Sequence, residues 1–275
     1  MNRVKKSILL GSLCLTVLLT AVPLLAAEGP AAGTAAPATP NPAMEQILRM
    51  ANFLAQLKEL SVTLNTGYDV VQESGQKIEF GETRKLTVAR PDKFRVDVER
   101  SDGEKSMAVF DGKAVTVFQP KQNMYAVSEV QGDIDAAILH FVRDLKMRLP
   151  LAMLFVTALP KELERRSLGA DIVETANVQG TPCVHVAGRG ETVDVQVWVP
   201  TTGDPLPRRI VLTYKNEEGQ PQYWANFSDW NLAPNPPANL FTLEIPKDAS
   251  RIEFLAKIPR AAEPAKPAAK RGGKR

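Results

Sequence analysis

Apolar and polar residues alternate along positions 76–130 more regularly than elsewhere in the chain. In the first part of this stretch, one of the two alternating phases holds Ile78, Phe80, Glu82, Arg84, Leu86, Val88 and Arg90. Alternation with a period of two places one face of a β-sheet on an apolar interior and the other face in water. Turn-forming residues interrupt the pattern at positions 90–92, 101–103, 111–113 and 119–123. The stretch therefore predicts five consecutive antiparallel strands joined as a meander.

A helix is predicted before this meander. Asn41 is typical of an N-cap, and Pro42 is typical of the first helical position. Apolar residues then recur at spacings of three and four through Leu60, which gives the helix one apolar stripe. We expect this helix to pack on the open face of the sheet.

A second helical region follows the meander. Its apolar spacing predicts a helix over 133–149, Pro150 interrupts it, a strongly apolar segment follows at 151–156, and 161–167 is typical of a short polar helix. An excursion of about 35 residues between two groups of strands is too long for a plain loop, and such insertions are often lids. We therefore expect this region to cover the sheet.

The remaining pattern is that of strands. One strand over 62–72 precedes the meander, and five more follow the helical region at 170–178, 182–188, 192–199, 206–215 and 221–232. The total is eleven strands with no alternation of strand and helix, so the fold class is mainly β (α+β). An antiparallel sheet this wide must curl, which predicts a barrel or a half-barrel.

The N-terminus predicts export from the cytoplasm. Three basic residues precede an apolar run over 7–27 that ends in small residues, which is the order of a secretory signal peptide over 1–27. The run is also about long enough to span a bilayer as an uncleaved anchor, but it is short for that role and closes with proline and alanine, which favours cleavage. Residues 28–40, rich in alanine and proline, are predicted to be a disordered linker. The folded domain is expected over 41–256.

The charge of the chain is uneven. The formal net charge is +3, yet positions 257–275 alone hold seven basic residues and one acidic residue. We expect this segment to be a disordered basic tail, either simply solvated or touching anionic membrane headgroups. Because the basic balance comes from the tail, it does not indicate a nucleic-acid groove in the fold.

The inventory of catalytic residues is thin. The mature chain would contain two histidines, His140 and His185, and one cysteine, Cys183, without a nucleophile elbow or a phosphate-binding loop. Cys183 and His185 share one face of a predicted strand but lack two further metal ligands at suitable spacing. Asp133 and Asp135 are typical of the acidic first turn of a helix. We therefore expect no enzyme, no metal and no cofactor.

Three charged residues share the inward phase of the meander. Glu82 and Arg84 occupy adjacent inward positions, so they could pair with each other or lie near an open rim, since a buried guanidinium is costly unless it is paired or hydrogen-bonded. Arg90 stands at a strand end before Pro91. It could donate to loop carbonyls of the covering segment, or it could be an exposed strand-end arginine.

The sequence around Arg90 resembles that of a known protein family. Arg90-Pro91-Asp92-Lys93-Phe94-Arg95-Val96, then positions 106–113 and the strand end Phe118-Gln119-Pro120, resemble the core of LolA-type periplasmic lipoprotein carriers. They resemble still more an uncharacterised family of predicted periplasmic proteins within that superfamily. The resemblance implies an unclosed half-barrel of about eleven strands, covered by an N-terminal helix and a helical lid over an apolar cavity that receives acyl chains. It also implies that Arg90 latches the lid.

The resulting hypothesis is a periplasmic, monomeric binding protein that encloses a lipid or lipoprotein acyl chain. The expected contacts of the ligand are Phe80, Leu86, Val88, Phe94, Val96, Val98, Leu151, Leu154 and Phe155. The alternative is a non-enzymatic cell-envelope sensor or scaffold that binds a protein partner through its sheet edge or its lid, because relatives of this fold include stress sensors.

Overall fold

A computed structural model describes residues 41–254, except 146, 148, 167 and 168. Within these residues, twelve strands form one sheet in the order β12-β6-β5-β4-β3-β2-β1-β11-β10-β9-β8-β7. The sheet does not close on itself, so β7 and β12 are its two edges and the fold is an unclosed half-barrel. The signal peptide over 1–27, the linker over 28–40 and the tail over 257–275 lie outside the described residues and stay predictions.

The strands follow the predicted pattern closely. The first group is β1 (Glu59–Val71), β2 (Lys77–Ala89), β3 (Lys93–Arg100), β4 (Lys105–Phe110), β5 (Ala114–Gln119) and β6 (Met124–Glu129). The second group is β7 (Gly169–Val178), β8 (Thr181–Arg189), β9 (Val193–Pro200), β10 (Arg209–Tyr214), β11 (Gln222–Asn231) and β12 (Ser250–Arg251). Antiparallel pairing of β1 with β11 joins the two groups. The predicted meander and all eleven expected strands are confirmed, and β12 was missed because two residues are too few to show a period.

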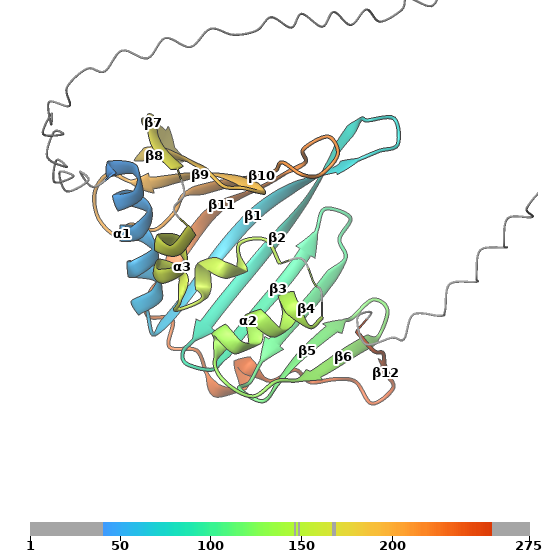
Figure 1. Cartoon of the computed structure of the whole chain (residues 1–275). Coiled ribbons are helices and arrows are strands. Elements are labelled where there is room, and N and C mark those ends of the chain that lie inside the picture. The colour runs from blue at the N-terminus through green and yellow to red at the C-terminus, as the bar shows by residue number, and fades with distance from the viewer. Residues whose placement is uncertain (1–40, 146, 148, 167–168, 255–275) are drawn as a thin grey trace, which may run out of the picture. The chain divides into compact units, whose positions relative to one another are not determined.

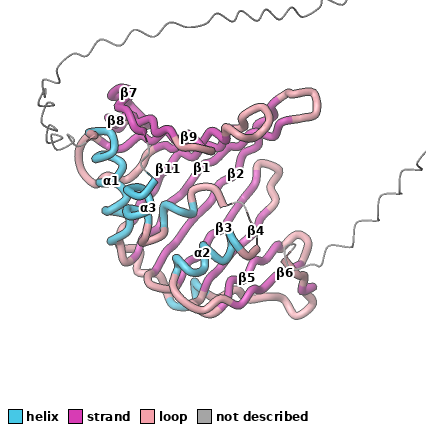
Figure 2. Tube along the Cα trace, in the orientation of Figure 1, coloured by secondary structure: helices cyan, strands magenta, loops and turns pink. Residues whose placement is uncertain are grey.

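The three α-helices gather on one face of the sheet, as Figures 1 and 2 show. They are α1 (Pro42–Gln56), α2 (Ile134–Arg143) and α3 (Leu159–Arg166), with the short 3₁₀ turn η1 (Ala152–Phe155) between α2 and α3. A second 3₁₀ turn, η2 (Ala238–Phe241), packs against β3 from the other face. The predicted start of α1 is confirmed, because the Asn41 side chain accepts a hydrogen bond from the Ala43 backbone N–H at 2.9 Å. The predicted end was wrong. Leu60 already belongs to β1, and its burial on the same core continued the helical spacing by coincidence.

The α2 region is shorter than its pattern indicated. The helix ends at Arg143, whereas the apolar spacing predicted helix as far as position 149. Leu145 is nevertheless buried, so it kept its apolar character without being helical. The Asp133 side chain caps α2 by accepting from the Ala136 backbone N–H at 2.9 Å, as expected of an acidic residue at a helix start.

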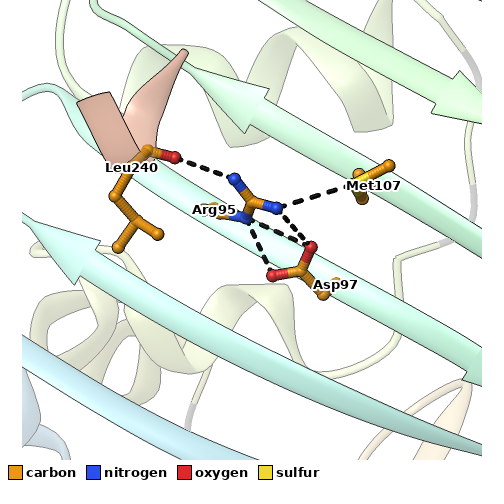
Figure 3. Close-up of polar contacts among 4 residues, drawn as sticks. All are labelled: Arg95, Asp97, Met107 and Leu240. Carbon is orange, nitrogen blue, oxygen red and sulfur yellow. Dashed lines mark hydrogen bonds and ion pairs between the residues drawn. The ribbon is translucent and has the colours of Figure 1, made fainter. Parts of the chain in front are cut away.

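After β11, in the middle of the sheet, the chain runs to the edge formed by the first group of strands through residues 232–252, here called the C-terminal strap. Arg95 on β3 donates to the Leu240 carbonyl of η2 at 3.2 Å, while Asp97 holds the guanidinium through two acceptor oxygens (Figure 3). The hydrogen bond to Asp97 is the main cause that raises the pKa of Arg95. At its end the strap pairs with β6 in parallel, which covers an otherwise open strand edge.

Candidate functional site

A cavity of about 350 Å³ lies between the first group of strands and the segment that contains α2 and η1. Its lining is mostly apolar, with charged groups at one side. The lining residues are Leu64, Glu82, Arg84, Leu86, Val88, Phe94, Val96, Val98, Arg100, Ser106, Met107, Ala108, Val117, Gln119, Ile134, Ile138, Phe141, Met147, Leu149, Pro150, Leu151, Ala152 and Phe155. A volume of this size is at the lower end for small-molecule sites.

Most of the residues predicted to contact a ligand line this cavity. They are Leu86, Val88, Phe94, Val96, Val98, Leu151 and Phe155. Phe80 is on the predicted face, but it is 42% exposed because the β1–β2 hairpin runs past the covering helices. Leu154 packs against the core beside the cavity instead of lining it. In a 3₁₀ turn, side chains three residues apart lie on the same side. In η1 the two residues that face the cavity are Ala152 and Phe155, so Leu154 points elsewhere.

Other lining residues were not singled out from the sequence, although signals for some of them existed. Arg100 continues the alternation of the Phe94 strand, and Ile134, Ile138 and Phe141 form the apolar stripe of α2. The inward direction of Ala108 and Val117 has no such clear signal, because their strands are only six residues long.

Arg90 joins the half-barrel to the covering segment. Its Nε donates to the Leu57 carbonyl at 2.9 Å and its Nη2 donates to the Phe155 carbonyl at 2.8 Å. Burial lowers the pKa of Arg90, and the nearby carboxylates of Asp135 and Asp133 oppose this. The guanidinium therefore bridges the end of α1 and the end of η1, which is the geometry that a latch needs.

A second connection, which the sequence did not reveal, fastens the same segment. The Asp135 carboxylate accepts from the Thr157 backbone N–H at 2.8 Å and from the Thr157 hydroxyl at 2.6 Å. It also accepts from the Ala158 backbone N–H at 3.2 Å. Sequence reasoning assigned Asp135 only to the first turn of a helix, and a partner 22 residues away leaves no local signal. We call residues 134–158 the lid.

Glu82 and Arg84 form an ion pair on the inward face of β2. Arg84 Nε donates to Glu82 Oε1 at 2.6 Å, and Arg84 Nη2 contacts the same oxygen. Of the two arrangements left open by the sequence, the structure has the pair, and it lies at one side of the cavity. On the inward face of β2, this ion pair therefore separates the apolar Leu86 and Val88 on one side from the exposed Phe80 on the other.

Three residues at the base of α2 are ordered like a hydrolytic triad. Ser128 Oγ lies 2.7 Å from His140 Nε2, and His140 Nδ1 lies 2.6 Å from Asp144 Oδ2. However, Ser128 is 0% exposed and does not line the cavity, so no substrate carbonyl can reach its hydroxyl. The contacts instead fasten α2 to β6.

The other two titratable residues considered from the sequence, Cys183 and His185, both lie on β8 in the second group of strands. His185 stacks on Trp198 at a ring distance of 3.9 Å, and its Nε2 lies 3.1 Å from Gln196 Oε1. Cys183 is buried, and this burial raises the pKa of its thiol while the Arg208 charge opposes the change. Among the described residues, no cluster of three or more His, Cys, Asp or Glu could hold a metal ion.

Comparison with known proteins identifies the family. Residues 43–255 match the model of the family "Predicted periplasmic protein (DUF2092)", so the chain belongs to that family and the expected resemblance is confirmed. The predicted periplasmic location agrees with this description. No curated protein matches the chain. Within the described ranges, no helix has the length and apolar character needed to cross a membrane.

Several solved structures are similar to this chain at low identity. An uncharacterized conserved protein of Thermus thermophilus has 11% identity and a TM-score of 0.46, covering 76% of this chain and 98% of its own. Lipoprotein LppX of Mycobacterium tuberculosis has 13% identity and a TM-score of 0.44, covering 69% and 94%. A LolA superfamily protein of Nitrosomonas europaea has 11% identity and a TM-score of 0.38, covering 73% and 97%. The case for a ligand rests on the cavity itself.

Proposed function

We propose that this protein is a non-enzymatic periplasmic carrier that encloses an apolar ligand, a lipid or a lipoprotein acyl chain, between its half-barrel and its lid. The observation that supports this proposal is the apolar cavity of about 350 Å³ beneath a lid that Arg90, at the end of β2, ties to the sheet. Apolar hollows in protein interiors are uncommon, because interiors pack as densely as organic crystals. Seven of the nine residues expected to contact the ligand line the cavity.

The lid has side chains that suit this role. Leu151 and Phe155 point into the cavity, and burial of such a side chain stabilises a closed state by about 1.5–3 kcal/mol. An acyl chain would replace these contacts with its own apolar surface, so entry of the ligand and movement of the lid would be linked. Arg90 and Asp135 would then decide how readily the lid moves.

Native mass spectrometry of the full chain, expressed with its own leader and purified from periplasmic extract, tests the proposal. We expect extractable lipid to remain with a monomer. Val98→Phe narrows the cavity and should lower the retained lipid, whereas Val173→Phe makes the same change on the exposed face of β7 and should not. A wild-type chain that never retains lipid and never binds added fatty acid would contradict the proposal.

One observation favours the alternative, a scaffold for a protein partner. Within the described part of the chain, the edge strand β7 has no neighbouring strand on one side, and its Ile172 and Val173 are 49% and 54% exposed. An unpaired strand edge with exposed apolar side chains can receive a strand from another protein. A stable protein partner in the extract, lost in Val173→Lys and accompanied by no lipid, would favour this function over the carrier.

A further inference from the structure

The apolar cavity has a polar neighbour. A second chamber of about 240 Å³ shares Glu82, Arg84, Arg100 and Pro150 with the cavity. Its remaining lining comes mainly from β1, β11 and the turn before β11, and it is much more polar. The two hollows therefore adjoin each other at the Glu82–Arg84 ion pair.

The carboxylates around this polar chamber already have partners. Glu82 accepts from Arg84, and Asp69 accepts from the Gln222 backbone N–H at 2.9 Å. Glu217 also has a partner of its own.

The two arginines of the chamber, by contrast, have donors to spare. Arg84 directs only its Nε and Nη2 at Glu82, although a guanidinium has five N–H donors. Arg100 has Glu104 no nearer than 3.7 Å, and its side chain is 54% exposed. The lining thus has three carboxylates and two guanidiniums, but these two arginines keep N–H donors that their ion pairs with Glu82 and Glu104 do not use.

Tyr223 supplies a second, independent observation. This residue is only 3% exposed and lines the polar chamber, yet its hydroxyl makes no hydrogen bond of normal geometry among the described residues. Burial raises the pKa of the Tyr223 hydroxyl, while the Arg84 charge and the nearby Thr66 side chain, whose own hydroxyl donates to the Glu82 carbonyl at 3.2 Å, oppose this. A buried hydroxyl that makes no hydrogen bond of normal geometry is costly. An acceptor atom in the chamber would satisfy it.

We infer that the ligand is an anionic amphiphile, whose chain fills the apolar cavity while its carboxylate or phosphate lies in the polar chamber against Arg84, Arg100 and the Tyr223 hydroxyl. This inference rests on the proposed carrier function and makes it more specific. The ion pair with Glu82 holds the Arg84 guanidinium in place, and the oxygen atoms of the ligand's head group accept hydrogen bonds from its remaining N–H donors. A neutral lipid would leave these donors and the Tyr223 hydroxyl unpaired, which lowers its affinity.

Displacement of the neutral dye Nile red from the full-length protein tests this inference, with palmitate and methyl palmitate as competitors. The two have the same chain and differ in the charge of the head. We expect palmitate to bind about tenfold tighter or more. In Glu82→Gln/Arg84→Gln both charges are removed together, so neither is left unpaired, and the preference for palmitate should fall severalfold, with Arg100 and Tyr223 accounting for what remains. Arg189→Gln, on the exposed face of β8, should retain the wild-type ratio.

A second variant keeps the test valid if the double variant does not fold. Tyr223→Phe retains the ring, and it should weaken palmitate by about threefold to tenfold. Equal binding of both ligands by the wild-type protein overturns the anionic head but leaves the carrier intact. Failure of both ligands and of Nile red to bind removes the carrier and the inference together. Stabilisation of the fold by inorganic phosphate alone, without any effect of palmitate, identifies a simple anion site and overturns the amphiphile.

Discussion

The two groups of strands use their inward faces differently. Under α1, the inward side chains Val186, Val199, Ala225 and Phe227 are completely buried and contribute to a continuous core. Under the lid, Val96 and Val98 of β3, Ala108 of β4 and Val117 of β5 are only partly buried and face the cavity. The same half-barrel thus has a filled side and a hollow side.

The covering segments explain this difference. α1 has 15 residues and fills its side with an apolar stripe that includes Ile47, Met50, Ala51 and Leu54. α2 has only 10 residues, and the chain then turns at Leu151, whose φ of 65° is left-handed, into the short η1. Arg90 ties the lid to the sheet and Asp135 links the two ends of the lid, through hydrogen bonds each worth about 1.5–3 kcal/mol when one partner is charged. The filled side is therefore the scaffold, and the hollow side is the part that can open.

Removal of one aromatic ring from each side provides the most direct test of this contrast. Phe227→Ala should lower the free energy of unfolding by about 3–5 kcal/mol, because the ring is completely buried in the filled side. Phe94→Ala removes the same ring from the cavity wall, where one side of it already lacks packing. We expect Phe94→Ala to lower the free energy of unfolding by at least about 1 kcal/mol less than Phe227→Ala does, as measured by urea denaturation. Equal losses would mean that the two sides are packed alike.

Arg90→Leu should release the lid while the fold persists. The variant loses both hydrogen bonds to the Leu57 and Phe155 carbonyls, so lid opening should become about 1.5–3 kcal/mol easier. Hydrogen exchange should become faster over residues 151–158 but not in α1. Arg165→Leu, an exposed arginine of α3, is the matched control. Unchanged exchange in the lid would show that Arg90 does not latch it.

Asp135→Ala should have the same effect on a smaller scale. It frees the backbone N–H groups of Thr157 and Ala158, which water can then satisfy, so the expected cost is about 1–2 kcal/mol of lid stability. Since Arg90 and Asp135 tie the same segment, the double variant should not be additive. Simple additivity of the two effects in hydrogen exchange would place them in separate units.

The smallest expected effect is that of Tyr223→Phe on the ligand-free protein. Removal of a buried hydroxyl that lacks a partner should change stability near neutral pH by about 0.5 kcal/mol or less, or increase it. Burial raises the pKa of this hydroxyl, so the folded state holds its proton to higher pH than the unfolded chain, which ionises near pH 10. The wild-type protein should therefore lose stability above about pH 10, and the variant should lose less. Equal alkaline melting curves would contradict this assignment.

Local patterns predicted the elements well and their ends poorly. The alternation of β2 assigned Phe80, Leu86 and Val88 to one face correctly, but it contains no information on how far the helices cover that face. The spacing of α1 continued through Leu60 because a buried strand residue and a buried helical residue look the same in a sequence. Neither the Asp135 contact with Thr157 nor the burial of Ser128 has a local signal, because both depend on segments far apart in the chain.

The sequence by itself determined the strand and helix order, the inward phase of β2 and the family to which the chain belongs. Only the tertiary structure decided that the inward face is filled under α1 and hollow under the lid, and that the polar chamber adjoins the hollow at Arg84. The physical reason is that the period of a strand fixes the direction of each side chain. The space that a side chain faces depends on the length and placement of the element packed above it.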